Sequence, residues 1–152
     1  MSARAPRDAE RILLTGATGT LGRPLLARLT AAGLPVRCLV RDPRRLGPAR
    51  VQVQIAIGNL ADQHGLNKAV RGVETVIHLA AATRDQGRGS IERINGVGTA
   101  RLVWAARRAG VRRFVYVSAL GASLNSPSRF IRTQSLARDA VADAGFESLI
   151  FE

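Results

Sequence analysis

The fold is decided by the stretch Thr15-Gly16-Ala17-Thr18-Gly19-Thr20-Leu21-Gly22, in which a glycine recurs at every third position. The preceding residues, 11–15, form a short apolar run that predicts a buried parallel strand. From residue 20 leucines recur at helical spacing until a glycine at position 33, which predicts a helix over residues 20–32. A second apolar run, residues 34–40, predicts another strand. These elements form a βαβ unit with the glycines at its first turn.

The rest of the chain repeats the alternation of strand and helix. Further strands are predicted at residues 50–57, 74–79, 113–118 and 146–152, and helices at residues 62–71, 90–110 and 129–144. This alternation is typical of an α/β protein with a doubly wound parallel sheet. Six such strands predict a Rossmann fold with strand order 3-2-1-4-5-6.

The chain divides into a short N-terminal arm, residues 1–10, and one domain, residues 11–152. The sequence stops on the sixth predicted strand. We therefore expect it to lack the usual C-terminal substrate-binding part, and a truncated fragment of a longer protein is one explanation.

Composition excludes several classes of protein. The 152 residues are 46% hydrophobic, which suffices for one core, but no apolar run approaches the roughly 20 residues of a membrane span. The N-terminal residues are polar and charged, so we predict a cytoplasmic protein without a membrane span. A single cysteine, Cys38, excludes an internal disulfide and is expected in the core. His64 and His78 have no ligand-spaced companions, so no metal site is predicted.

The net charge of +12 raises the question of a polyanionic partner. Lys68 is the only lysine among 23 basic residues, and an excess of arginine of this kind is typical of a GC-rich genome. The arginines are dispersed from Arg4 to Arg138 rather than gathered in one block. We therefore do not expect nucleic acid to be the partner.

The glycine stretch has the chemistry of a dinucleotide site. One glycine permits the tight turn, a second lets the backbone approach a pyrophosphate, and a third lets helix and strand pack closely. The start of the helix offers free N–H groups and the positive end of its dipole, and threonine hydroxyls can add donors. The predicted contacts are Thr15, Gly16, Thr18, Gly19, Thr20, Leu21 and Gly22.

The choice of cofactor depends on the end of the second strand, Val40-Arg41-Asp42. NAD sites usually place an acidic residue there for the ribose hydroxyls, whereas NADP sites place an arginine near the 2′-phosphate. Arg41 can pair with that phosphate while its guanidinium plane covers the adenine. NADP(H) is therefore preferred, and Asp42 leaves NAD(H) possible.

From residue 11 to 152 the chain resembles the extended and atypical short-chain dehydrogenase/reductases, and within them the NmrA-like group and the related complex I accessory subunits. Residues 15–23 resemble that family's phosphate loop almost letter for letter. Residues 58–62 resemble its adenine-contacting segment, with Asn59 where an aspartate is usual, and residues 76–81 resemble its segment beside the nicotinamide ribose. The resemblance implies further cofactor contacts at Asn59, Leu60, Leu79, Ala80 and Ala81.

The resemblance continues over residues 110–122 and puts Ser118 at the family's active-site hydroxyl, although a buried serine at a strand end is the alternative. The family's catalytic tyrosine and lysine, four residues apart, correspond here to Phe130 and Gln134. Neither replacement can transfer a proton or lower a neighbouring pKa electrostatically. The resemblance therefore carries over the nucleotide site and not the catalytic pair.

Three functions remain open. The preferred one is a nucleotide-binding sensor or regulator without reductase chemistry, whose substrate or protein partner is unidentified. The second is an NADPH-dependent oxidoreductase or isomerase that uses Ser118. The third is a structural or assembly protein with a bound nucleotide.

Overall fold

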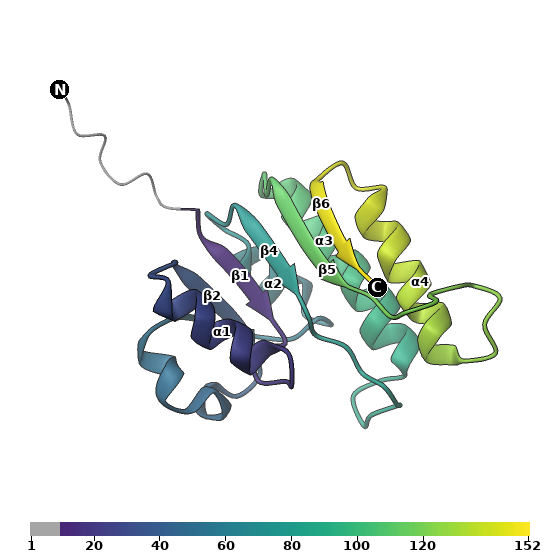
Figure 1. Cartoon of the computed structure of the whole chain (residues 1–152), viewed down its shortest axis with the longest axis horizontal. Coiled ribbons are helices and arrows are strands. Elements are labelled where there is room, and N and C mark those ends of the chain that lie inside the picture. Colours follow the sequence, from purple (N-terminus) through teal and green to yellow (C-terminus); the bar gives the residue numbers. More distant parts are fainter. Residues whose placement is uncertain (1–9) are drawn as a thin grey trace.

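The structure, a computed structural model, describes residues 10–152 of the chain. Six parallel strands form one sheet in the order β3-β2-β1-β4-β5-β6 (Figure 1). This confirms the predicted α/β Rossmann arrangement. The strands are β1 (Ile12–Thr15), β2 (Val36–Val40), β3 (Gln54–Ile57), β4 (Thr75–His78), β5 (Arg113–Val117) and β6 (Glu147–Phe151). Of the predicted arm, residues 1–9 lie outside the described residues.

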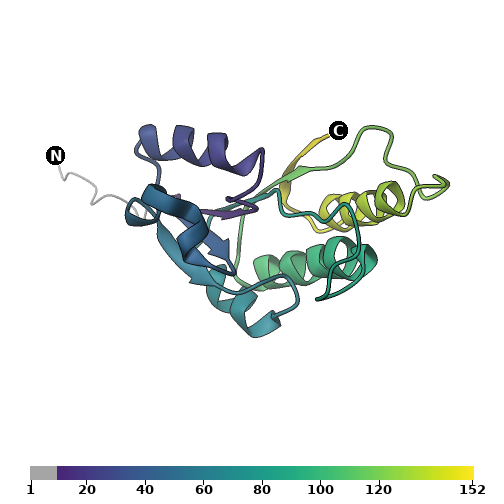
Figure 2. The same cartoon turned by 90° about the horizontal axis from the view of Figure 1, so that it is seen from below.

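Helices cover both faces of the sheet. Figure 2 shows α1 on one face and α3 and α4 on the other. None of the helices in residues 10–152 is both long and apolar enough to span a membrane. The helices are α1 (Gly22–Ala31), η1 (Pro43–Val51), α2 (Gln63–Ala69), η2 (Glu92–Val97), α3 (Gly98–Arg108) and α4 (Arg129–Ala142).

Two apolar cores flank the central strand β1. Its consecutive residues Leu13 and Leu14 are both fully buried and, because strand side chains alternate, they point into different cores. Leu13 packs with residues of α2, α3 and α4, whereas Leu14 packs with Leu26 of α1 and with Cys38. Cys38 is fully buried, as predicted, and burial raises the pKa of its thiol to about 11.

The predicted strand at residues 50–57 is wrong in its first half. Residues Pro43–Val51 form two 3₁₀ turns that meet at Gly47, whose φ of +58° is not helical, and the strand begins only at Gln54. The helix starts where the Asp42 side chain accepts a hydrogen bond from the backbone N–H of Arg44, with Pro43 at the first helical position. A second turn follows Gly47 and begins with Pro48, so residues 50 and 51 are helical although the apolar spacing of this stretch favours a strand.

The predicted helix at residues 90–110 contains a π-helical segment, η2, followed directly by α3. The wider turn presents the buried side chain of Asn95 to the loop after β4. There its oxygen accepts from the N–H of Ala82 and its nitrogen donates to the carbonyl of Ala82. The other predicted elements begin and end within two residues of the observed ones.

One part of the sheet is not covered by any helix of residues 10–152. Phe114 and Tyr116 of β5 are buried toward α3 and α4, so the alternate residues, Val115 and Val117, face the side of α1. In register with them on β6 lie Leu149 and Phe151, whose exposed fractions are 53% and 52%. Figure 2 shows no helix over this side of β6. We call these four residues the open strip.

Candidate nucleotide-binding site

The three glycines of the loop between β1 and α1 differ in what surrounds them. Gly16 has a φ of +74°, and a β-carbon on it would lie 2.7 Å from the backbone nitrogen of Ala80. A β-carbon on Gly22 would lie 1.9 Å from the carbonyl oxygen of Gly16. At Gly19 the nearest atom would be the same oxygen, at 3.3 Å. Gly16 therefore permits close approach of the segment after β4, and Gly22 lets α1 start against the loop, whereas Gly19 faces a more open space.

Helix α1 begins with free donors. Its N-cap residue, Leu21, makes no side-chain capping bond, and no acidic residue lies in its first turn. Within residues 10–152, the structure records no acceptor for the backbone N–H groups of Thr20 and Leu21. Such a helix end attracts an anion, because its N–H groups point outward and its dipole is positive there.

A pocket of about 550 Å³ lies against this loop, at the carboxyl ends of β1 to β4. This is the place where strand order reverses and where open α/β sheets bind their ligands. Ten predicted site residues line it: Thr15, Gly16, Thr18, Gly19, Arg41, Asn59, Leu60, Leu79, Ala80 and Ala81. Thr20, Leu21 and Gly22 do not line it and lie at the start of α1.

Arginines dominate the charge of the pocket. In the described part of the chain five of them line it: Arg41 and Arg45 after β2, Arg88 in the loop after β4, Arg93 in η2 and Arg101 in α3. Sequence reasoning identified only Arg41, since the other four carry no recognisable motif and are gathered by the fold. The dispersed arginines of the sequence thus produce a local concentration of positive charge.

Within residues 10–152, Asp42 is the one acidic residue that lines the pocket. Its carboxylate pairs with the Arg44 guanidinium at 3.0 Å and also accepts from the backbone N–H of Arg44 at 3.0 Å. These hydrogen bonds hold the pKa of Asp42 below its usual value. The carboxylate that could have accepted bonds from ribose hydroxyls is therefore already engaged at the start of η1.

A buried histidine supports the floor of the pocket. The hydroxyl of Thr15 accepts hydrogen bonds from the backbone N–H groups of Leu79 and Ala80, both at 3.2 Å. Because these two bonds occupy its lone pairs, the Thr15 hydroxyl donates its own proton to His78 Nδ1, at 2.6 Å. The ring proton of His78 therefore lies on Nε2, which donates to the hydroxyl of Thr99 at 2.8 Å. Burial lowers the pKa of His78 to about 4, so the ring is neutral at pH 7. The Thr15 hydroxyl, predicted as a ligand donor, is committed to this network.

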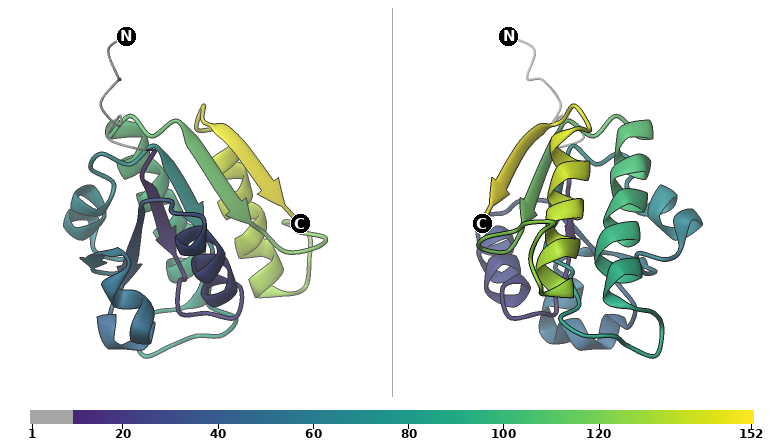
Figure 3. Two further views of the ribbon diagram at one scale, coloured as in Figure 1. Left: turned by 60° about the vertical axis from the view of Figure 1, so that its left-hand side comes forward. Right: turned by 90° about the vertical axis from the view of Figure 1, so that its right-hand side faces the viewer.

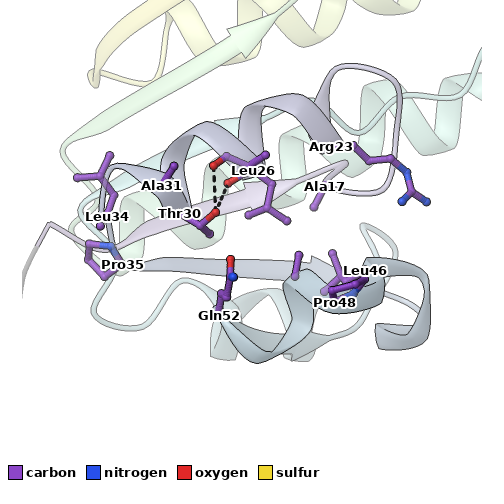
Figure 4. Close-up of a pocket in the computed structure, with 13 residues that line it drawn as sticks. Ala17, Arg23, Leu26, Thr30, Ala31, Leu34, Pro35, Leu46, Pro48 and Gln52 are labelled. Atoms are coloured by element: carbon purple, nitrogen blue, oxygen red, sulfur yellow. Dashed lines mark hydrogen bonds between the residues drawn. The ribbon is translucent and has the colours of Figure 1, made fainter.

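Arg23 connects the glycine loop to η1. Its guanidinium donates to the carbonyl of Thr18 at 3.0 Å and to the carbonyl of Arg45 at 3.3 Å. Figure 4 shows Arg23 at one end of a second hollow, of about 840 Å³, that lies between α1 and η1 and is lined mainly by apolar residues such as Leu26 and Leu46. Arg23 thus connects two segments that line the nucleotide pocket, the glycine loop at Thr18 and η1 at Arg45, although it does not line that pocket itself.

Ser118 lies just after β5 and does not line the pocket. Its backbone N–H donates to the carbonyl of Phe151 at 2.8 Å, whereas its buried hydroxyl has no hydrogen-bond partner in the described part of the chain.

In α4 the side-chain oxygen of Gln134 accepts a hydrogen bond from the hydroxyl of Tyr116. Burial raises the pKa of Tyr116 above its usual value. Gln134 therefore serves the core between α4 and β5 and supplies no charge.

The sheet order, the glycine loop and the cation-lined pocket define a nucleotide-binding α/β protein of the Rossmann class. Residues 16–148 match the model of the NAD(P)H-binding family, and the chain belongs to that family.

Curated relatives and solved structures agree with this. The chain is 42% identical over 113 residues to sterol demethylase protein B of Methylococcus capsulatus, which covers 72% of this chain and 34% of that protein. It is 34% identical over 140 residues to ceramide reductase of Caulobacter vibrioides, covering 91% of this chain and 44% of that protein. Dinucleotide binding and membership of the short-chain dehydrogenase/reductase superfamily are confirmed. The chain spans less than half the length of either relative.

Among solved structures, the chain is similar to a short-chain dehydrogenase/reductase superfamily protein from Agrobacterium tumefaciens with bound NAD. The TM-score is 0.72 at 29% sequence identity, over 92% of this chain and 48% of that one.

Proposed function

We propose that the chain binds NADP(H) in preference to NAD(H) and acts as a dinucleotide-dependent sensor or regulator rather than as a reductase of the tyrosine–lysine type. The observation that carries the preference is the charge of the pocket. In the described part of the chain five arginines line it, and the one carboxylate there, Asp42, pairs with Arg44. NADP(H) differs from NAD(H) by one phosphate, and guanidinium groups bind phosphate strongly.

The residues that line the pocket fit a dinucleotide placed across it. The diphosphate would lie at Gly19 and the uncapped start of α1, where free N–H groups can donate to it. The adenine end would lie between Arg41 and the segment Asn59–Leu60, and the nicotinamide ribose would lie beside Leu79–Ala81. A bound nicotinamide would supply a site for hydride transfer.

The proposed absence of ordinary reductase chemistry rests on the residues around the pocket. Phe130 cannot exchange a proton, and Gln134 is buried and bonded to Tyr116. The titratable side chains that line the pocket are arginines and Asp42. Asp42 has a lowered pKa and arginine stays charged, so neither kind of group exchanges a proton readily near pH 7.

Titration calorimetry with NADP⁺, NADPH, NAD⁺ and NADH tests this proposal. We expect both phosphorylated cofactors to bind at least about tenfold more tightly than their counterparts, because one additional charge-assisted contact has that magnitude. Equal affinities would remove the proposed preference, and no binding by any of the four would remove the whole proposal.

An oxidoreductase that uses Ser118 is the second candidate. Two observations favour it: the hydroxyl of Ser118 is buried without a partner, and a curated relative is named ceramide reductase. A screen of carbonyl and quinone compounds for NADPH oxidation, repeated with Ser118→Ala, tests this candidate. Turnover that disappears in Ser118→Ala would favour it over the sensor, whereas absence of turnover with every compound would favour the sensor.

A further inference from the structure

A short turn on the loop after β4 places Arg88 at the pocket that Arg41 also lines. Within this turn Gln86 and Gly89 exchange two backbone hydrogen bonds, at 3.0 and 2.9 Å, and Arg88 lies between them. Figure 3 shows this loop leaving the same end of the sheet as the segment that follows β2. Arg88 and Arg41 therefore reach one pocket from two segments far apart in the sequence.

The turn is anchored on the side away from the pocket. The carboxylate of Asp85 accepts from the backbone N–H of Ile91 at 3.0 Å and pairs with Arg129 of α4 at 3.0 Å. Arg129 also pairs with Glu92 at 2.7 Å. These contacts occupy the acidic groups of the loop, so they position the turn without neutralising Arg88.

Arg41 and Arg88 repel each other in the absence of an anion. Within residues 10–152 the structure records no hydrogen bond or ion pair for either guanidinium group. Slight burial, and then the positive charge of Arg41, lower the pKa of the otherwise exposed Arg88. Two like charges at one pocket destabilise each other, and an anion that contacts both removes the repulsion and gains charge-assisted hydrogen bonds.

We propose that Arg88 forms a two-arginine clamp with Arg41 and that the clamp binds the 2′-phosphate by which NADP(H) differs from NAD(H). This inference rests on the proposed function and deepens it, because it assigns specificity to a residue of the loop after β4. It also gives that loop a direct part in cofactor choice.

Binding measurements on Arg88→Gln test the clamp. Four ligands are used, NADP⁺, NAD⁺, 2′,5′-ADP and 5′-ADP, so that the extra phosphate is probed with and without the nicotinamide half. The matched control is Arg84→Gln, since Arg84 lies on the same loop, is exposed and does not line the pocket. Both substitutions are at exposed positions, and circular dichroism with thermal melting verifies that each variant is folded.

We expect Arg88→Gln to weaken NADP⁺ and 2′,5′-ADP by roughly tenfold or more and to change NAD⁺ and 5′-ADP less than about threefold. Arg84→Gln should change none of the four. In Arg41→Gln/Arg88→Gln the two losses should not be additive, because both side chains bind one phosphate.

The outcomes separate the two proposals. If the unsubstituted chain prefers NADP⁺ and Arg88→Gln retains that preference, the clamp is wrong and the proposed function stands. If Arg88→Gln weakens all four ligands equally, Arg88 contributes only general positive charge, and the clamp is again wrong. If the unsubstituted chain binds none of the four, both proposals are wrong.

Discussion

The hydroxyl of Tyr116 in β5 donates a hydrogen bond to the side-chain oxygen of Gln134 in α4, and both side chains are buried. The family resemblance sets Gln134 against the lysine of the catalytic pair. In this structure its side chain connects α4 to the sheet.

Replacing Gln134 by leucine should therefore destabilise the protein. It leaves the Tyr116 hydroxyl buried without a partner, at a cost of about 1–3 kcal/mol in the free energy of unfolding. Adding Tyr116→Phe removes the stranded hydroxyl and should restore part of the loss. Urea unfolding of the four members of this double-mutant cycle measures the coupling. Additive losses would show that the two side chains do not depend on each other.

The three loop glycines should respond differently to substitution. Gly22→Ala places a β-carbon within 1.9 Å of the Gly16 carbonyl, so the backbone must move, and we expect a loss of about 3 kcal/mol or more in unfolding free energy. Gly19→Val should remain folded, yet its branched side chain should block the diphosphate. Thermal melting and calorimetry distinguish the two effects. A folded Gly19→Val variant with unchanged cofactor affinity would contradict the assignment of the loop.

Arg41→Ala should erase most of the preference for NADPH over NADH, because it removes one of the two arginines proposed to bind the extra phosphate. We expect NADPH to lose at least about tenfold in affinity and NADH much less. Arg50→Ala is the matched control, since Arg50 is an exposed arginine of η1 that does not line the pocket. A preference that survives in Arg41→Ala assigns cofactor choice to other residues.

Acid should destabilise the protein through His78. Its pKa is about 4 when folded, against an ordinary value near 6.5, so below pH 6.5 the unfolded chain binds a proton that the folded chain does not. Stability is therefore fully present above pH 6.5 and falls toward pH 4. Between pH 7.5 and pH 5 we expect a loss of about 2 kcal/mol.

Urea unfolding at a series of pH values measures this loss. The window stays above pH 5 because carboxylates titrate mostly below it. His64→Asn serves as the control at an exposed histidine and should retain the full loss. Equal stability of the unsubstituted protein at pH 7.5 and pH 5 would contradict the buried, neutral state of His78.

The open strip should make the chain associate. Leu149 and Phe151 expose apolar surface on β6, which is an edge strand of the sheet formed by residues 10–152, and both features favour contact between copies. The double variant Leu149→Thr/Phe151→Thr should reduce concentration-dependent association in sedimentation velocity and leave cofactor affinity unchanged. Association that persists unchanged in that variant would place the contact elsewhere.

Local patterns predicted most of the fold. The apolar run of β1, the leucine spacing of α1 and the glycines between them are signals within a few residues of each other, and alternation of the remaining elements led to the strand order. The strand predicted at residues 50–57 failed at its start because residues 50 and 51 belong to a second 3₁₀ turn, which follows Gly47 and Pro48 and which apolar alternation did not reveal.

The parts of the pocket that carry a sequence motif could be predicted, whereas the residues that come together only through folding could not. Arg88, Arg93 and Arg101 reach the pocket from the loop after β4, η2 and α3. No spacing in the sequence connects them to Arg41. The part played by His78 is equally hidden, because it depends on Thr15 and Thr99, both distant along the chain.

The bonds around Thr15 have a consequence for the thermodynamics of binding. They join β1 to the residues after β4 through contacts that involve no ligand, so the floor of the nucleotide pocket is preorganised. An incoming nucleotide then loses little affinity to ordering of the protein at this point. The conformational entropy lost on binding should come mainly from the arginine side chains that line the pocket. Substitutions of these arginines can therefore change affinity without altering the fold.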